Sequence, residues 1–165
     1  MAAPGRYTAR LTIANADAAT QRWSMSQPFV VRADPRQLKD GVTPAVMRAQ
    51  LAHNLKVRDM VSETNRLVAR MRAARTRFAG AAQQDSLRLL QAIEGKLLTP
   101  TVRYSRPGLQ AHINYLYGMT MQADQRVPRD AVERFQALRR ELDAVQAEAR
   151  RLLGPERETT ASTGS

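Results

Sequence analysis

Residues 43–78 read TPAVMRAQLAHNLKVRDMVSETNRLVARMRAARTRF, and this stretch decides the fold. Thr43 can cap a helix and Pro44 suits the first helical position. No Gly or Pro follows until Gly80, so the pattern continues for roughly 35 residues, about 50 Å of helix. One apolar stripe recurs at three- and four-residue steps: Met47, Leu51, Leu55, Val61, Leu67, Val68, Met71 and Phe78. A helix of this length needs partners of matching length, which predicts a helical bundle.

Three shorter helices are predicted downstream. They span about residues 85–98, about residues 108–123, and a last segment that opens at Val127-Pro128 and closes at Gly154-Pro155. Their predicted apolar faces comprise Leu87, Leu90, Ile93 and Leu97; Leu109, Ile113, Leu116 and Thr120; and Phe135, Leu138, Leu142, Val145, Ala149 and Leu152. Short connections favour an up-down arrangement, so we expect an antiparallel four-helix bundle. The two middle helices together should match the outer two in length.

The first 33 residues predict β-structure. Tyr7, Ala9, Leu11 and Ile13 alternate with polar residues, as in a half-buried strand. Residues 15–20 are typical of a turn, and a second extended stretch runs over residues 22–31. Pro28 within it favours an edge position or a break into two short strands. Two strands alone are marginal in water, so this hairpin should either dock on the helices or complete a larger sheet.

The chain is therefore predicted to be mainly α with a small β part. We expect β-strands in residues 1–33, a linker in residues 34–42, the helical bundle in residues 43–154 and a disordered polar tail in residues 155–165. Apolar runs are only a few residues long, which predicts no membrane span. No charged start followed by an apolar core marks a secretory signal at the N-terminus.

The net charge of +11 comes mostly from arginine, which supplies 23 of the 26 basic residues. Such a balance indicates an acidic partner, either nucleic acid, an anionic membrane surface or an acidic protein. The alternative is that these arginines are ordinary residues on solvent-exposed helix faces and bind no partner, since they are spread over the whole chain. The absence of Cys excludes disulfides, Cys-based metal sites and thiol catalysis.

The residues that could carry chemistry match no standard catalytic pattern. His53 and His112 lie on different predicted helices and have no His-x-x-x-His or Glu-x-x-His partner, so neither predicts a metal site. Carboxylates such as Asp59 and Glu63 have arginines nearby in the sequence and are explained as surface ion pairs. There is no Gly-x-Ser-x-Gly motif and no glycine-rich phosphate loop. We therefore expect a protein without enzymatic activity, metal or cofactor.

One local feature suggests binding to a polyanion. Within twelve residues that contain no acid lie five arginines: Arg66, Arg70, Arg72, Arg75 and Arg77. They could neutralise phosphates, with weak and salt-sensitive binding expected from so few contacts. The alternative is a solvated helix end whose positive charge complements the C-terminal helix dipole. The stretch lacks interleaved aromatic residues, which argues against recognition of single strands.

Three tyrosines lie in or near the predicted helix at about residues 108–123. Tyr104, Tyr115 and Tyr117 could line a binding groove, although tyrosines at the end of a bundle more often pack with their hydroxyls in water. We therefore predict that these tyrosine rings pack against the bundle and do not line a binding groove.

Several motifs occur in the same order as in a bacterial family. The N-terminal ones are Gly5, Tyr7, Ala9 and Leu11, then Gln27, Pro28, Phe29 and Val31, then Asp34-Pro35-Arg36. The helical ones are Leu55-Lys56-Val57-Arg58-Asp59, Glu63-Thr64-Asn65, the run of residues 109–117 (LQAHINYLY) and that of residues 130–135 (DAVERF). Together they resemble the C-terminal region of exported sortilin-like proteins with Asp-box (BNR) repeat propellers, often labelled glycosyl-hydrolase-like.

This resemblance implies that the strands are the end of an immunoglobulin- or fibronectin-like sandwich, and the helices a C-terminal appendage. The Asp-box motif and the propeller are missing, so no catalytic residue carries over. The expected function is that of a non-catalytic accessory or protein-interaction module, exported if the resemblance holds. Its partner would be another protein, or the propeller and sandwich domains of a parent chain. The alternative is a free-standing basic helical module that binds nucleic acid or another polyanion.

Overall fold

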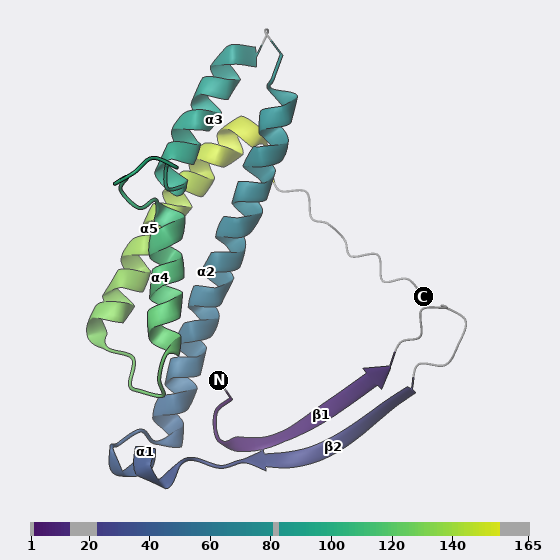
Figure 1. Cartoon of the computed structure of the whole chain (residues 1–165), viewed down its shortest axis with the longest axis vertical. Coiled ribbons are helices and arrows are strands. Elements are labelled where there is room, and N and C mark those ends of the chain that lie inside the picture. The colour runs from purple at the N-terminus through teal and green to yellow at the C-terminus, as the bar shows by residue number, and fades with distance from the viewer. Residues whose placement is uncertain (1, 14–22, 81–82, 156–165) are drawn as a thin grey trace. The chain divides into compact units, whose positions relative to one another are not determined.

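The computed structural model describes residues 2–13, 23–80 and 83–155. In these residues the chain is mainly helical, with a small two-stranded antiparallel sheet at the N-terminus followed by five helices (Figure 1). The elements are β1 (Gly5–Ile13), β2 (Trp23–Val31), α1 (Pro35–Lys39), α2 (Pro44–Arg77), α3 (Gln84–Leu97), α4 (Leu109–Met121) and α5 (Arg129–Leu153). None of the helices in the described part of the chain has the length and apolar character required to cross a membrane.

The predicted strands and the four long helices are confirmed, each within a few residues of its expected bounds. β2 continues through Pro28 without a break. The short helix α1 was not expected, because residues 34–42 were predicted to be a linker. It begins where the Asp34 Oδ1 accepts a hydrogen bond from the Arg36 amide at 2.9 Å, with Pro35 in the first turn. The predicted turn at residues 15–20 and all but the first residue of the predicted tail lie outside the described residues.

The chain falls into two compact units. The first unit comprises residues 1–53 with residues 121–127, and the second comprises residues 54–120 with residues 128–165. The long helix α2 therefore contributes its beginning to the first unit and its remainder to the second.

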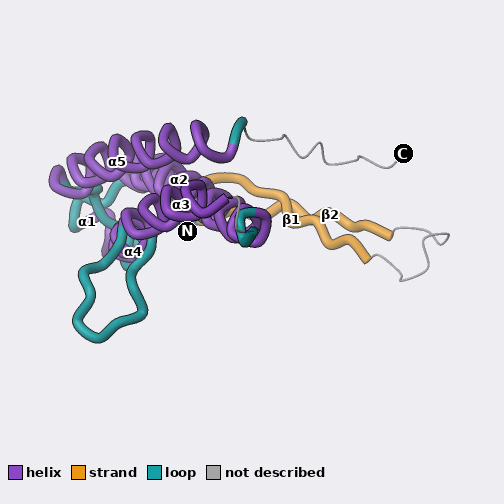
Figure 2. The backbone as a smooth tube through the Cα atoms, turned by 90° about the horizontal axis from the view of Figure 1, so that it is seen from above, coloured by secondary structure: helices purple, strands orange, loops and turns teal. Residues whose placement is uncertain are grey.

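The hairpin in the first unit has two chemically different faces. Its register pairs Gly5 with Val31 at one end and Ile13 with Trp23 at the other, and Figure 2 shows the two strands as a twisted ribbon. Residues paired directly across the strands share a face, and successive residues alternate between faces. One face therefore carries Tyr7, Ala9, Leu11, Ile13, Met25, Gln27 and Phe29. The other carries Arg6, Thr8, Arg10, Thr12, Ser24, Ser26, Pro28 and Val30.

A buried glutamine organises the rest of the first unit. Gln50 is 1% exposed, and its side-chain amide donates to the Ala123 carbonyl at 2.7 Å. The Gln50 Oε1 accepts a hydrogen bond from the backbone amide of Gln125 at 3.0 Å. Two backbone groups of residues 121–127 are thus bound by one side chain of α2, which holds this loop against the start of the helix.

The helices of the second unit lie in three rows: α2 forms one, α5 another, and α3 and α4 follow one another along α2 in the remaining row. Three hydrogen bonds or ion pairs, taken from the C-terminal end of α2, establish this order: Arg75 with Glu94, Asn65 with Gln110, and Asn54 with Thr120. Both helices therefore run antiparallel to α2, with α3 above α4 in Figure 1.

The third row is α5, which runs parallel to α2. Glu63 pairs with Arg139 and, further along both helices, Arg70 bonds to Gly154. The predicted antiparallel four-helix bundle is not confirmed in that form, since α3 and α4 share one row and α5 is parallel to α2.

The buried stripe of α2 differs from the predicted one. Met47, Leu67, Val68 and Met71 are buried as expected, whereas Leu55 is 40% exposed. Three apolar residues of α2 outside the predicted stripe are also buried: Val57 at 0%, Met60 at 1% and Ala74 at 0% exposed. The stripe also includes polar side chains with hydrogen-bond partners, such as Asn54, which donates to the Thr120 carbonyl at 3.1 Å, and Thr64, which donates to the Met60 carbonyl at 2.8 Å. The predicted faces of α3, α4 and α5 are buried or half-buried throughout.

A close backbone approach occurs where the α3–α4 loop returns to the end of α3. The amide of Gly108 donates to the Thr99 Oγ1 at 3.0 Å. A Cβ atom on Gly108 would lie 2.5 Å from the carbonyl carbon of Leu98 and 2.7 Å from the carbonyl oxygen of Leu97. These neighbours are backbone atoms and cannot rotate away, so only glycine fits here.

We predict that Gly108→Ala lowers the free energy of unfolding by about 1–3 kcal/mol, because the added methyl group overpacks the α3–α4 junction. Urea denaturation measures the effect. The matched control is Gly95→Ala in α3, where an added Cβ meets nothing within 4 Å. This control should instead raise stability by about 0.5–1 kcal/mol, because alanine is the better helix former. Equal effects of the two substitutions would contradict the steric explanation.

Candidate functional site

The five arginines of the predicted polyanion site do not share one surface. At 100° per residue, Arg66, Arg70 and Arg77 lie on one side of α2, while Arg72 and Arg75 lie on the other. Arg75 is used in an ion pair with Glu94 of α3 at 3.1 Å. The predicted cluster of five arginines is therefore divided into two groups on opposite sides of α2.

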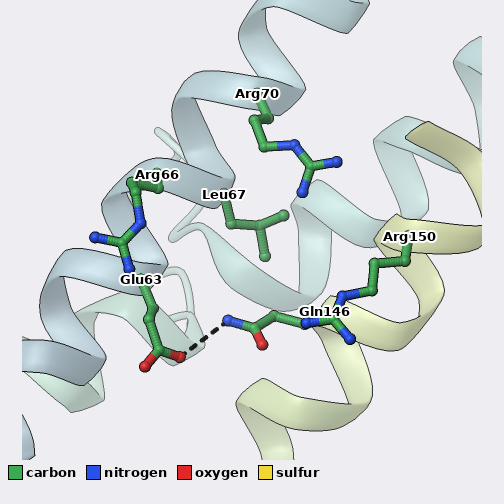
Figure 3. A pocket seen from close by; sticks show the side chains of 6 residues that line it. All are labelled: Glu63, Arg66, Leu67, Arg70, Gln146 and Arg150. Carbon is green, nitrogen blue, oxygen red and sulfur yellow. Dashed lines mark hydrogen bonds between the residues drawn. The ribbon is translucent and has the colours of Figure 1, made fainter. Parts of the chain in front are cut away.

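Two of these arginines line a pocket between α2 and α5. Glu63, Arg66, Leu67 and Arg70 contribute from α2, and Gln146 and Arg150 contribute from α5. The pocket has a volume of about 300 Å³. Figure 3 shows Arg70 and Arg150 reaching from their two helices toward the space beside Leu67. Within the described part of the chain, three guanidinium groups and one carboxylate therefore line a single pocket.

The Glu63 carboxylate, the one acid among the described residues of the pocket wall, is partly compensated by an arginine outside it. The Glu63 Oε2 accepts hydrogen bonds from the Arg139 Nη1 at 2.7 Å and from the Gln146 Nε2 at 3.2 Å. Arg139 also donates to the Asp143 Oδ1 at 2.7 Å. Burial by itself lowers the pKa of Arg139, but its hydrogen bonds to Glu63 and Asp143 outweigh burial and leave that pKa raised. Glu63 therefore pairs with a guanidinium outside the pocket wall, which it shares with Asp143.

Arg70 is held in place by the end of α5. Its Nη2 donates to the carbonyl oxygen of Gly154 at 2.8 Å, and Gly154 ends the helix with a positive φ of 78°. Arg66 and Arg150 are exposed, and neither forms an ion pair within the described residues. One guanidinium is thus positioned by the fold, and two others are available to a ligand.

A second pocket lies between α3 and α5 and has a different character. Its volume is about 440 Å³, and its lining is Leu89, Ala92, Ile93, Lys96, Glu148, Arg151 and Leu152. Lys96 and Glu148 form an ion pair across it at 2.7 Å. Because two of its three charged side chains, Lys96 and Glu148, pair with each other, it offers less to a charged ligand than the arginine-lined pocket does.

The packing prediction is wrong for two of the tyrosines. Tyr104 is 88% exposed and Tyr115 is 68% exposed, so neither ring is part of the core. Tyr104 has a positive φ of 61°, and the guanidinium of Arg103 lies 4.9 Å from the centre of its ring. Tyr104 therefore lies on the surface, in the α3–α4 loop.

Both histidines are half-buried helix residues, His53 in α2 and His112 in α4. In the part of the chain that the structure describes, no group of three or more His, Cys, Asp or Glu side chains is placed to hold a metal ion. Among the residues described, the structure thus brings arginines together, but not metal ligands.

Comparison with known proteins adds no assignment. No protein-family model, curated protein or solved structure matches this chain. The resemblance to sortilin-like propeller proteins therefore stays a prediction, which rests on its ordered motifs alone.

We predict that Arg139→Gln lowers the free energy of unfolding by about 1–2 kcal/mol, because it leaves the partly buried Glu63 without its charged donor. Chemical denaturation gives the value. Arg129→Gln is the matched control, since Arg129 pairs with Glu133 one turn away and its side chain is 92% exposed. The control should change stability by less than about 0.5 kcal/mol. A loss as large in the control would show that only net charge matters.

Proposed function

We propose that this chain is a non-catalytic accessory module that makes protein–protein contacts through its N-terminal hairpin. In this proposal, β1 and β2 are the closing strands of an immunoglobulin- or fibronectin-like sandwich. The other strands belong to a partner protein or to another part of a longer polypeptide. The observation that carries the proposal is the exposure of the hairpin's apolar face.

That face is exposed along both strands. Leu11 is 58%, Ile13 50%, Met25 57% and Phe29 47% exposed, and all four lie on the same side of the ribbon. Tyr7 and Phe29 stack with their ring centroids 5.8 Å apart, which extends the apolar surface toward the open end of the hairpin. Contiguous apolar surface of this kind marks an interaction site. The polar face, with its arginines, serines and threonines, suits contact with water.

The hairpin also offers an edge for strand pairing. The described sheet contains only two strands, so each has an outer edge with unpaired backbone groups. β1 has no proline, whereas Pro28 removes one amide donor from β2. The edge of β1 therefore keeps a full set of donors and is the better template for an added strand. Pairing there would extend a sheet whose two strands are marginal alone.

The motif resemblance supports the same proposal from an independent direction. In sortilin-like propeller proteins, the matching strands would be the closing strands of a sandwich, and the helical segment would be its C-terminal appendage. A parent chain of that family would supply the missing strands. The resemblance carries over no catalytic residue, in keeping with an accessory role.

Site-specific photocrosslinking in the source cells tests the proposal. We expect a photoreactive side chain at Phe29, on the apolar face, to give a crosslinked product. The same group at Ser26, on the polar face, should give little or none. The apolar face would be buried against other strands, whereas the polar face would contact water.

The mass of the product distinguishes the outcomes. A Phe29 product heavier than the 18.4 kDa of this chain supports an external partner or parent sequence. A crosslink from Phe29 to residues of the chain's own helices would overturn the proposal, because the hairpin would then dock internally. Equal yields from Phe29 and Ser26 would show random collision and would also count against it. An immunoblot with an antibody to the helices then shows whether the missing strands belong to the same polypeptide.

A further inference from the structure

We infer that the pocket between α2 and α5 binds a small phosphorylated ligand, namely a phosphate monoester or inorganic phosphate in its dianionic form. This site is separate from the hairpin and does not depend on the proposed function. It differs from the cluster expected from the sequence, because it combines two arginines of α2 with one of α5.

The charge of the pocket favours a dianion. Among the residues that the structure describes, Arg66, Arg70 and Arg150 line it together with one acid, Glu63. The Glu63 carboxylate pairs with Arg139, a guanidinium from outside the wall that it shares with Asp143, so at most one net negative charge from this group faces the pocket arginines. A ligand with two negative charges would complement Arg66 and Arg150, which form no ion pair within the described part of the chain, and a single carboxylate or halide would not.

Geometry favours phosphoryl oxygens. Guanidinium groups present pairs of parallel N–H donors that match phosphate in a bidentate arrangement. Arg70 and Arg150 come from different helices and reach toward the same space, so they can bind one phosphate from two sides (Figure 3). Arg66 adds charge from the next turn of α2.

Part of the site is organised before any ligand binds. The hydrogen bond from Arg70 to the Gly154 carbonyl restricts the orientation of the Arg70 guanidinium, and the hydrogen bond from Gln146 to Glu63 restricts the orientation of the Gln146 amide. Leu67, 3% exposed, forms a fixed apolar wall. Groups that are already ordered lose less conformational entropy on binding.

The size of the pocket limits the ligand. A volume of about 300 Å³ lies at the lower end of the range for small-molecule sites. It suits a phosphoryl group with a small organic substituent. A nucleic-acid backbone would present phosphodiesters, each with one charge, along an extended surface, and a single pocket of this size does not match that pattern.

Two double variants separate the pocket from the overall charge of the protein. The pocket variant combines Arg66→Gln with Arg150→Gln, which should leave the fold intact because neither arginine has an ion-pair partner among the described residues. The control combines Arg72→Gln with Arg140→Gln. These two arginines are exposed, lie on the same two helices and do not line the pocket. Both variants lose the same charge.

The experiment is calorimetric titration of methyl phosphate into the full chain at neutral pH and low ionic strength. We expect the control to bind methyl phosphate more tightly than the pocket variant does, because its lost charges lie outside the pocket and act on the ligand only through the solvent. The pocket variant should bind at least about tenfold more weakly, because two charge-assisted contacts are lost. Dimethyl phosphate, a monoanion of similar shape, should bind at least about tenfold more weakly than methyl phosphate. Circular dichroism verifies that both variants are folded.

Three results would overturn the inference. The first is the absence of methyl phosphate binding to the unaltered protein at low ionic strength. The second is equal weakening in the pocket variant and the control, which would assign binding to overall charge. The third is binding of a short DNA duplex that the pocket substitutions abolish, with methyl phosphate unbound, which would assign the arginines to a nucleic acid.

Discussion

The length of α2 is the constraint on which the helical part of the structure depends. A helix of 34 residues extends for about 51 Å, and its buried stripe must be covered along that distance. Neither α3 nor α4, with 14 and 13 residues, can do this alone. They follow one another along α2, and α5 covers the remaining side. This solution requires a tight return of the chain between α3 and α4, which is why the backbone at Gly108 approaches Leu97 and Leu98 so closely.

The sequence contained enough information to predict the elements, because their signals are local. Thr43-Pro44 and Gly154 mark helix ends by capping and backbone conformation, and the alternation from Tyr7 to Ile13 marks a strand. The buried stripe of α2 was harder to predict, since Asn54 and Thr64 occupy core positions as polar residues. Their burial depends on hydrogen bonds with carbonyl groups, including one on another helix, that a count of apolar residues does not detect.

The arginine-lined pocket could be predicted only in part. Arg66 and Arg70 were identified by their density in the sequence, but Gln146 and Arg150 were not. Each follows directly after a buried residue of α5, Val145 or Ala149, and so flanks the apolar stripe. Such flanking positions face the neighbouring helix once the pairing of rows is known. That α5 runs parallel to α2 is a tertiary fact, so the partnership of Arg70 with Arg150 required the structure.

The amphipathic hairpin has a consequence for how this protein behaves in solution. Copies that carry an exposed apolar ribbon attract one another at short range, while a net charge of +11 keeps them apart. Added salt shortens the reach of that repulsion to about 10 Å at 0.1 M and leaves the apolar attraction in place. The colloidal stability of the isolated chain is thus set by ionic strength, and a dilute, low-salt buffer is the condition in which it stays dispersed.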